Sequence, residues 1–250
     1  MVKEEKLKIL VFCRAEPRHI YFANSICRHL PVDSIFLEKK PSIFDRDKLN
    51  IERVFFFGNN KARFANNRII KYVPDINCEE VSSYLSRYDK LFICTFGCSI
   101  IKMDNAFRKN VHILNLHSGI LPQYRGVHCV FWALYNKRPD MVGGSVHFVD
   151  RGIDSGDVIT RIFPAISSND DETALFNKTI KSSVKEFVKA ALVLYRHGNL
   201  SGKPQVKVGK VYFAKDRNKL CEAKVGDLLR SGLLSRSLRK EKIEKFYESA

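Results

Sequence analysis

The feature of this sequence that most constrains its fold is a series of short, mainly apolar runs. These runs lie at 8–13, 32–37, 51–57, 90–96 and 111–115. The first of them, Lys8–Cys13, is continuously apolar after Lys8 and rich in β-branched residues, which is typical of a strand buried on both faces, and we expect the others to be strands as well. Stretches with apolar residues at helical spacing separate some of them, at 18–30 and 79–88. Strands that alternate with helices predict an α/β fold built on a mainly parallel sheet.

The second half of the sequence extends this pattern. It predicts a short helix at 127–135, strands at 144–149 and 157–163, and a long helix at 168–197. We therefore expect residues 1–205 to form one Rossmann-like domain, with a twisted, mainly parallel sheet and helices on both faces. Residues 206–250 hold 12 Lys or Arg against 6 Asp or Glu, and we expect them to form a short, basic, Leu-containing C-terminal extension.

The composition bounds the class of protein and its partners. With 45% hydrophobic residues, 13 Gly and 8 Pro, the chain has the composition of a globular protein rather than a disordered or fibrous one. Lys and Arg number 43 and Asp and Glu 27, so the formal net charge of +16 favours anionic partners such as phosphates. The segment 14–19 after the first predicted strand lacks a Gly-x-Gly-x-x-Gly loop, so dinucleotide binding is not predicted.

The cysteines and the apolar segments predict a cytoplasmic protein. The seven cysteines are an odd number without a CxxC pair, which indicates neither a disulfide framework nor a zinc site. No apolar window approaches the roughly 18 residues that a membrane span needs. The first eight residues carry acidic side chains, and the apolar run after them is too short for a signal sequence. We expect no metal and no membrane partner.

Residues with catalytic chemistry gather at the ends of predicted strands. Asn115 and His117 close one strand two residues apart, so both side chains point to the same side. Asp154 lies in a Gly-rich turn between two predicted strands. An amide, an imidazole and a carboxylate together suit acyl transfer to an amine, because the amide can hold a developing oxyanion while the other two move protons. The spacing alone leaves open a structural role, in which Asn115 caps a turn and His117 is a satisfied core imidazole.

The residues around these three side chains resemble a known motif. The segment 115–126 reads Asn-Leu-His-Ser-Gly-Ile-Leu-Pro-Gln-Tyr-Arg-Gly. It is similar to the Asn-x-His-x-Ser-Leu-Leu-Pro and Tyr-Arg-Gly motif of the folate-dependent formyltransferases, in which a His and, seven residues later, an Asp follow on a strand and turn. The matching positions are Asn115, His117, Leu121, Pro122, Tyr124, Arg125, Gly126, His147 and Asp154. One departure is Gly119, which stands where the family usually has Ser.

The resemblance implies an activity and a set of site residues. The enzyme would transfer a formyl group from N10-formyltetrahydrofolate, its cosubstrate, to a primary amine by direct attack through a tetrahedral intermediate. Asn115, His117 and Asp154 would be catalytic, and His147 a structural member of the site. The folate would bind at Ile93, Thr95, Phe96, Gly97, Val149, Asp150, Gly152 and Ile153. Candidate contacts to the acceptor are Tyr124, Arg125 and Gly126.

Members of the family differ in the amine that they formylate. The chain most resembles the sugar N-formyltransferases, which act on nucleotide-linked amino sugars such as a dTDP-4-amino-4,6-dideoxyhexose for lipopolysaccharide or other glycan biosynthesis. A diphosphate linkage would suit the basic charge. Because family members are often dimers, we also expect a homodimer, with the Leu-rich tail as a candidate contact.

Other acceptors and one other class of protein stay open. The segment 14–18 lacks the Gly-Ser-Asn loop of the enzymes that formylate glycinamide ribonucleotide, and about 50 residues follow the catalytic domain, too few for the barrel of the methionyl-tRNA enzymes. A formyltetrahydrofolate hydrolase would use water as the acceptor. A basic nucleic-acid-binding protein is the alternative from another class, but aromatic residues in the basic tail are limited to a few such as Phe246 and Tyr247, so nucleic acid is not the expected partner.

Overall fold

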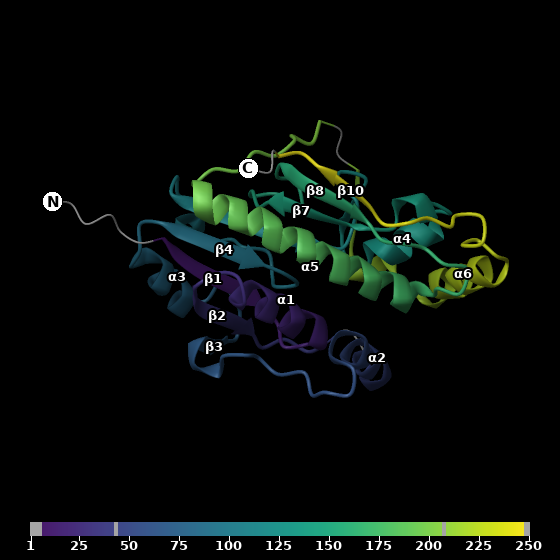
Figure 1. Ribbon diagram of the computed structural model, residues 1–250, viewed down its shortest axis with the longest axis horizontal. Coiled ribbons are helices and arrows are strands. Elements are labelled where there is room, and N and C mark those ends of the chain that lie inside the picture. Colours follow the sequence, from purple (N-terminus) through teal and green to yellow (C-terminus); the bar gives the residue numbers. More distant parts are fainter. Residues whose placement is uncertain (1–6, 43–44, 207–208, 248–250) are drawn as a thin grey trace. The chain divides into compact units, whose positions relative to one another are not determined.

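The computed structural model of the protein describes residues 7–42, 45–206 and 209–247 (Figure 1). The chain divides into two compact units. The first comprises Met1–Asn115 and Val188–Asn199, and the second comprises Leu116–Phe187 and Leu200–Ala250. Both units combine strands with helices, as an α/β fold requires.

A parallel sheet forms the centre of the first unit. Its strands are β1 (Lys8–Cys13), β2 (Val32–Glu38), β3 (Ile70–Val73), β4 (Leu91–Thr95) and β5 (Val111–His117), of which β5 ends in the second unit. They lie in the order β5-β4-β1-β2-β3, and each neighbouring pair is parallel. Figure 1 labels β4, β1, β2 and β3 in this order. β1 pairs on both sides, and its residues from Ile9 to Cys13 are fully buried. The predicted mainly parallel sheet is confirmed, and its carboxyl ends share one edge.

Three helices of the first unit connect these strands: α1 (Pro17–Cys27), α2 (Arg46–Phe57) and α3 (Glu79–Ser86). α1 begins with Pro17, which suits the first helical position because its missing N–H needs no partner there. α3 carries Glu79 and Glu80 in its first turn, where negative charge is favourable. The helices predicted at 18–30 and 79–88 are thus confirmed.

The prediction of a strand at 51–57 is wrong, because this run belongs to helix α2. Asp45 caps the helix by accepting a hydrogen bond from the Lys48 N–H at 2.9 Å. Glu52, inside the run, is buried and accepts from Arg18 Nη1 at 2.6 Å. A short apolar run does not distinguish a buried strand from a helix segment, and here the upstream cap and the ion pair decided the outcome.

Three antiparallel strands, a parallel pair of short strands and three helices make up the described part of the second unit. β7 (Gly144–Phe148), β8 (Val158–Phe163) and β10 (Lys242–Lys245) are antiparallel neighbours, while β6 (Tyr124–Gly126) and β9 (Lys210–Tyr212) form a parallel pair. The helices are α4 (Cys129–Tyr135), α5 (Glu172–His197), which ends in the first unit, and α6 (Lys219–Arg230). Turns of 3-10 helix lie at Asn67–Ile69, Asp104–Phe107, Pro139–Met141 and Ala214–Asp216.

The long helix α5 confirms the helix predicted at 168–197. Asp171 accepts a hydrogen bond from the Ala174 N–H at 2.7 Å and so satisfies the start of the helix. Gly198, with φ +71°, ends it by donating its N–H to the Leu194 carbonyl at 2.9 Å. The buried stripe comprises Ile180, Val184, Phe187, Ala191 and Leu194.

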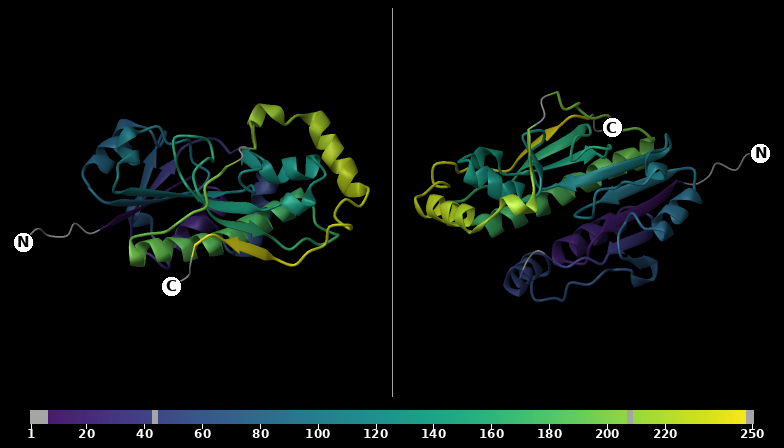
Figure 2. Two further views of the ribbon diagram at one scale, coloured as in Figure 1. Left: turned by 90° about the horizontal axis from the view of Figure 1, so that it is seen from above. Right: turned by 180° about the vertical axis from the view of Figure 1, so that it is seen from behind.

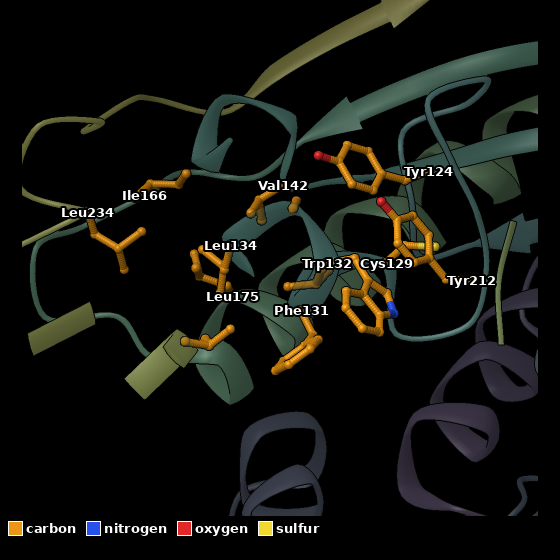
Figure 3. Packing of buried hydrophobic residues seen from close by; sticks show 13 residues of the cluster. Tyr124, Cys129, Phe131, Trp132, Leu134, Val142, Ile166, Leu175, Tyr212 and Leu234 are labelled. Carbon is orange, nitrogen blue, oxygen red and sulfur yellow. The ribbon is translucent and has the colours of Figure 1, made fainter. Parts of the chain in front are cut away.

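The C-terminal segment, residues 209–247, adds elements to the second unit. β9 pairs with β6, β10 pairs with β8, and α6 packs on α4, where Figure 2 shows the yellow-green helix beside the teal one. Tyr212, Val225 and Leu234 from this segment lie in one buried hydrophobic cluster with Trp132 of α4 (Figure 3). The segment therefore contributes to the core of this unit.

Three further observations on the described residues concern membrane-spanning helices, cysteine thiols and metal sites. No helix in the described ranges is long and apolar enough to cross a membrane. All seven cysteines are free thiols. Among the residues that the structure describes, no group of three or more His, Cys, Asp or Glu side chains is arranged to hold a metal ion.

Candidate active site

Asn115 is held by its neighbour in the parallel sheet of the first unit. It pairs in register with Thr95 at the end of β4. The Thr95 hydroxyl, which is buried, lies 2.9 Å from Asn115 Oδ1 and 3.1 Å from the Leu114 carbonyl, and its single hydrogen is shared between these two acceptors. The carbonyl end of the Asn115 side chain is therefore fixed by the protein itself.

In the second unit, His117, His147 and Asp154 converge. His117 Nδ1 lies 3.5 Å from Asp154 Oδ2, and His147 Nε2 lies 3.5 Å from Asp154 Oδ1. The two imidazoles come from β5 and β7, and their ring centroids are 6.3 Å apart in a T-shaped arrangement. Both are buried, with 5% and 2% of their surface exposed. Two of the three predicted catalytic residues, His117 and Asp154, thus lie side by side, and His147 contacts the same carboxylate.

Backbone groups of β6 fix this arrangement from one side. His117 Nε2 lies 2.9 Å from the Tyr124 carbonyl oxygen, and the Gly126 N–H donates to Asp154 Oδ2 at 2.8 Å. His147 Nδ1 lies 2.7 Å from the Phe148 carbonyl oxygen. Each imidazole therefore has one nitrogen on a backbone carbonyl and the other facing Asp154.

This pattern determines which ring nitrogens carry hydrogen. A carbonyl oxygen only accepts, so His117 Nε2 and His147 Nδ1 are the donors. In a neutral imidazole the other nitrogen, which faces the carboxylate, has a lone pair and no hydrogen. When His117 gains a proton, its Nδ1 becomes a donor toward Asp154, and a charge-assisted hydrogen bond can form. The constellation can therefore take up a proton.

Burial and charge set the resting protonation of this group. Burial lowers the pKa of the His117 imidazole, against the opposing effect of Asp154, and so favours the neutral ring. Burial would raise the pKa of the Asp154 carboxyl, but His117, His147 and the Gly126 N–H outweigh it and hold that pKa well below its usual range. An ionised carboxylate beside a neutral imidazole is the expected state near neutral pH.

The turn that carries Asp154 is built by its own side chains. Asp154 has φ +48°, a left-handed conformation that is uncommon outside glycine. Asp150 Oδ1 accepts from the Gly152 N–H at 3.0 Å and from the Ser155 hydroxyl at 2.6 Å. Such strain persists where surrounding contacts impose it, and it is common at functional sites. Asp150 and Gly152, both predicted folate contacts, thus shape the turn.

The predicted acceptor contacts are engaged within the protein. Arg125 is 8% exposed, and its Nε donates to the Ile153 carbonyl at 2.8 Å. Tyr124 is buried, and the Gly126 N–H meets Asp154. Of the second predicted folate segment, Val149 is half-buried beside the exposed Asp150. Their predicted binding roles stay predictions.

The predicted folate segment of the first unit lies at the end of β4. Ile93, Thr95 and Phe96 are buried, and Gly97 has φ +67°. A Cβ at Gly97 would overlap Nε2 of His19, so glycine is required there by the close approach as well as by φ. His19 is the residue of this corner that the sequence reasoning missed.

His19 belongs to a buried polar cluster after β1. Its Nδ1 lies 2.7 Å from Glu16 Oε2, and its ring stands 4.8 Å from that of Phe96. Burial lowers the pKa of His19 from 6.5 to about 4. A His three residues after a Glu in the first helical turn was the only local signal for this pair.

One further residue, Ser145, supports the motif turn after β5. Ser145 Oγ donates to the Gly119 carbonyl at 2.8 Å and accepts from the Leu121 N–H at 3.1 Å. Ser145 lies on β7 between Gly144 and Val146, and nothing in this local sequence indicated that its hydroxyl supports the turn. Ser145 is fully buried, and both bonds join β7 to the turn that follows His117.

Comparison with known proteins places the motif in a family. The family described as formyl transferases matches residues 61–191, more than half of the 250-residue chain. The methionyl-tRNA formyltransferase of Paraburkholderia phymatum is 28% identical over 102 residues, which cover 41% of this chain and 31% of that protein. The trifunctional purine biosynthetic protein adenosine-3 of Drosophila melanogaster is 34% identical over 82 residues, 33% of this chain and 6% of that protein. The chain thus matches less than a third of the length of either relative.

Solved structures share the fold. A sugar N-formyltransferase from a Shewanella species has a TM-score of 0.63 at 14% identity, with 89% of this chain and 87% of that one covered. A 4-N formyltransferase from Francisella tularensis gives 0.62 at 18% identity, with 87% and 86% covered. An N-formyltransferase from Helicobacter canadensis, in complex with folinic acid and dTDP-3-aminofucose, gives 0.61 at 17% identity, with 85% and 72% covered. From the match over more than half of its length, and from the motif that carries the buried His117–Asp154 pair, this chain belongs to the formyl transferase family.

Proposed function

We propose that this protein transfers a formyl group from N10-formyltetrahydrofolate to the primary amine of a nucleotide-linked amino sugar. The observation that carries the proposal is the buried pair of His117 and Asp154 within the family motif. The acceptor class, exemplified by a dTDP-4-amino-4,6-dideoxyhexose, is supported by solved structures of the same fold, one of which holds folinic acid and dTDP-3-aminofucose. The net charge of +16 suits a diphosphate-linked substrate.

Asn115 would stabilise the negative charge that develops on the formyl oxygen during attack. Its Oδ1 accepts from Thr95, which leaves the N–H groups as the donor end of the amide. A donor that is already oriented needs no reorganisation when the charge develops, and removal of one such donor typically lowers the rate about 100- to 1000-fold. Thr95, a predicted folate contact, would therefore also orient a catalytic residue.

His117 and Asp154 would handle the proton that the attacking amine loses. The low pKa of the buried imidazole keeps a lone pair on Nδ1 at rest, and the ionised Asp154 stabilises the ring once it is protonated. Asp154 would then relay the proton toward the leaving folate nitrogen through water. His117 could donate to the formyl oxygen only by exchanging its Nε2 bond to the Tyr124 carbonyl for the substrate.

The donor set fits the proposed cosubstrate. A formyl group needs a hydrogen-bond donor at its oxygen and a proton acceptor near the amine, and an amide, a neutral imidazole and a carboxylate supply these. We further propose that the pterin contacts the segments 93–97 and 149–153, and that Tyr124, Arg125 and Gly126 contribute to the acceptor site, on the family resemblance. A cytoplasmic homodimer is part of the same proposal, and light scattering would test its mass.

A panel of acceptors tests the function. The purified chain would be incubated with N10-formyltetrahydrofolate and, separately, with dTDP- and UDP-linked 3-amino and 4-amino sugars, glycinamide ribonucleotide and methionyl-tRNA. We expect mass spectrometry to show the gain of one CO unit on an amino sugar, and no gain with Asp154→Asn. Formylation of glycinamide ribonucleotide or tRNA alone would replace the proposed acceptor. Release of formate without any formylated amine would identify a hydrolase.

A further inference from the structure

Two backbone atoms of one short strand hold both groups of the His117–Asp154 pair. The Tyr124 carbonyl accepts from His117 Nε2 at 2.9 Å, and the Gly126 N–H donates to Asp154 Oδ2 at 2.8 Å. Both atoms belong to β6, which is three residues long. The position of this strand therefore decides where the imidazole and the carboxylate lie.

β6 is itself held by β9 from the C-terminal segment. The strands are parallel, with Tyr124 opposite Lys210 and Gly126 opposite Tyr212. Beyond the pairing, the Val127 N–H donates to the Tyr212 carbonyl at 2.9 Å, and the Gly209 N–H donates to the Pro122 carbonyl at 2.8 Å. A two-stranded pair of this length is marginal in isolation, so its alignment depends on side-chain anchors.

Glycines allow the two backbones to approach closely at both ends of the pair. A Cβ at Gly126, whose φ is +87°, would overlap the Tyr212 carbonyl oxygen. A Cβ at Gly209 would overlap the carbonyl oxygens of Pro122 and Gln123. Gly126 in β6 and Gly209 directly before β9 thus permit backbone contacts that a larger residue would push apart.

Tyr212 anchors β9 to the core of the second unit. Its ring stacks on Tyr124 at 5.9 Å and on Trp132 at 4.8 Å (Figure 3). Its hydroxyl accepts from Asn136 Nδ2 at 2.9 Å. Only 7% of Tyr212 is exposed. Aromatic packing of this kind fixes an element in place through a large buried area and a specific geometry.

We propose that Gly209 and Tyr212 are positioning residues for formyl transfer: the C-terminal strand β9 aligns β6, and β6 aligns His117 and Asp154. The proposal rests on the proposed function for its effect on catalysis, but the alignment itself concerns this chain alone. Misplacement of reacting groups by about 1 Å can cost about 100-fold in rate. A shift of β9 should therefore lower the rate of formyl transfer even though Gly209 does not contact the substrate.

Gly209→Ala tests this alignment, with Gly226→Ala as the matched control. The control lies in α6 of the same C-terminal segment, where a Cβ would meet only the flexible end of Arg230. We expect Gly209→Ala to lower kcat about 10- to 100-fold, while KM for the amino sugar changes less. Tyr212→Ala should act likewise, and Tyr212→Phe, which keeps the stacked ring, should restore most of the activity.

The nitrogen resonances of the His117 ring supply a readout that needs no substrate. In the wild-type protein they should report hydrogen on Nε2, and in Gly209→Ala they should shift toward the other tautomer, while Gly226→Ala leaves them unchanged. A folded Gly209→Ala protein with wild-type kcat and unchanged His117 resonances would overturn the proposal. If the wild type formylates no acceptor, the proposed function fails, yet a shifted His117 signal would still support the alignment.

Amide exchange keeps the proposal testable if Gly209→Ala does not fold. In the folded wild type, the N–H groups of Val127 and Gly209 should both be protected, because each donates across the β6–β9 pair. Rapid exchange at both amides would show that β9 does not hold β6, and would overturn the alignment.

Discussion

The His117 ring can occupy its present position only because residue 119 is a glycine. A Cβ at this position would lie 2.5 Å from His117 Nε2, 2.6 Å from the Tyr124 carbonyl oxygen and 2.7 Å from Cys129 Cβ. The family motif usually has Ser there, so this chain lacks that hydroxyl. The imidazole occupies the space instead, and its Nε2 bonds to Tyr124. A side chain at 119 and the present ring position exclude each other.

Substitution of the proposed catalytic residues should remove activity and leave the fold. We expect Asn115→Ala to lower kcat about 100- to 1000-fold through loss of the oxyanion donor, and Asp154→Asn to lower it about 100-fold or more through loss of proton transfer. Steady-state kinetics with the unformylated amino sugar as acceptor would measure both. The exposed Asp227→Asn in α6 serves as the control. Unfolding of both variants would instead support structural roles for these residues.

The buried His19 should make the protein less stable in acid. Its folded pKa of about 4 lies below the ordinary 6.5, so the unfolded chain binds the proton more readily. The stabilising contribution is therefore complete above pH 6.5 and is lost as the pH falls toward 4, by about 3 kcal/mol in the free energy of unfolding. Urea unfolding across this range would measure the slope. His19→Gln should show a shallower slope, and equal slopes would contradict the prediction.

At the scale of elements, apolar runs in the sequence identified the buried strands, but the short strand β3 was missed. β1, β4 and β5 pair with neighbours in the sheet, so most of their residues are apolar and the strands are readable from the sequence. β3 (Ile70–Val73) pairs on one side only with β2, has an exposed Tyr72, and followed a polar stretch, so no strand was predicted there. A strand with one neighbour needs fewer apolar residues and leaves a weaker signal.

A glycine in the interior of helix α6 offers a substitution that should stabilise the protein. Gly226 lies in the helix interior, and an added Cβ would stand 3.2 Å from Arg230 Nη1, the end of a flexible side chain. Gly226→Ala should raise the free energy of unfolding by about 0.5–1 kcal/mol, because alanine loses less backbone freedom on folding. Gly58→Ala, at φ +59° in open space, should instead lower it by about 1–2 kcal/mol. Denaturant unfolding would show opposite signs for the two.

Binding of the cosubstrate should stabilise the protein as a whole. A folate that binds the native state alone adds about 2.7 kcal/mol of stability at 100 times its dissociation constant. We expect 5-formyltetrahydrofolate to raise the thermal midpoint in a concentration-dependent way. A nicotinamide dinucleotide should have no effect, since the segment after β1 lacks the glycine loop that binds its phosphates. Absence of any shift with saturating folate would count directly against the proposed cosubstrate.

Because the protein has a net charge of +16, we expect its affinity for the proposed nucleotide-sugar acceptor to fall modestly as the salt concentration rises. A nucleotide sugar carries two phosphates, so its affinity should fall with a log–log slope of about −2 or shallower, whereas tRNA binding through many phosphates would give a steeper slope. Titrations of dTDP-sugar and of methionyl-tRNA between low and high salt would compare them. Tight, steeply salt-dependent binding of tRNA would favour the methionyl-tRNA alternative.

The sequence by itself determined four of the five strands of the parallel sheet of the first unit, all but β3, and the identity of the motif residues. Strands buried on both faces are apolar along their whole length, and Asn115, His117 and Asp154 carry a chemistry that is recognisable from residue type and spacing. Only the tertiary structure decided what residues 209–247 do. β9 has no pattern of its own, since its hydrogen-bond partners are backbone atoms of β6, far earlier in the chain. The alignment of Gly126 with Asp154 arises only when these two backbones meet, and no local preference of either segment specifies it.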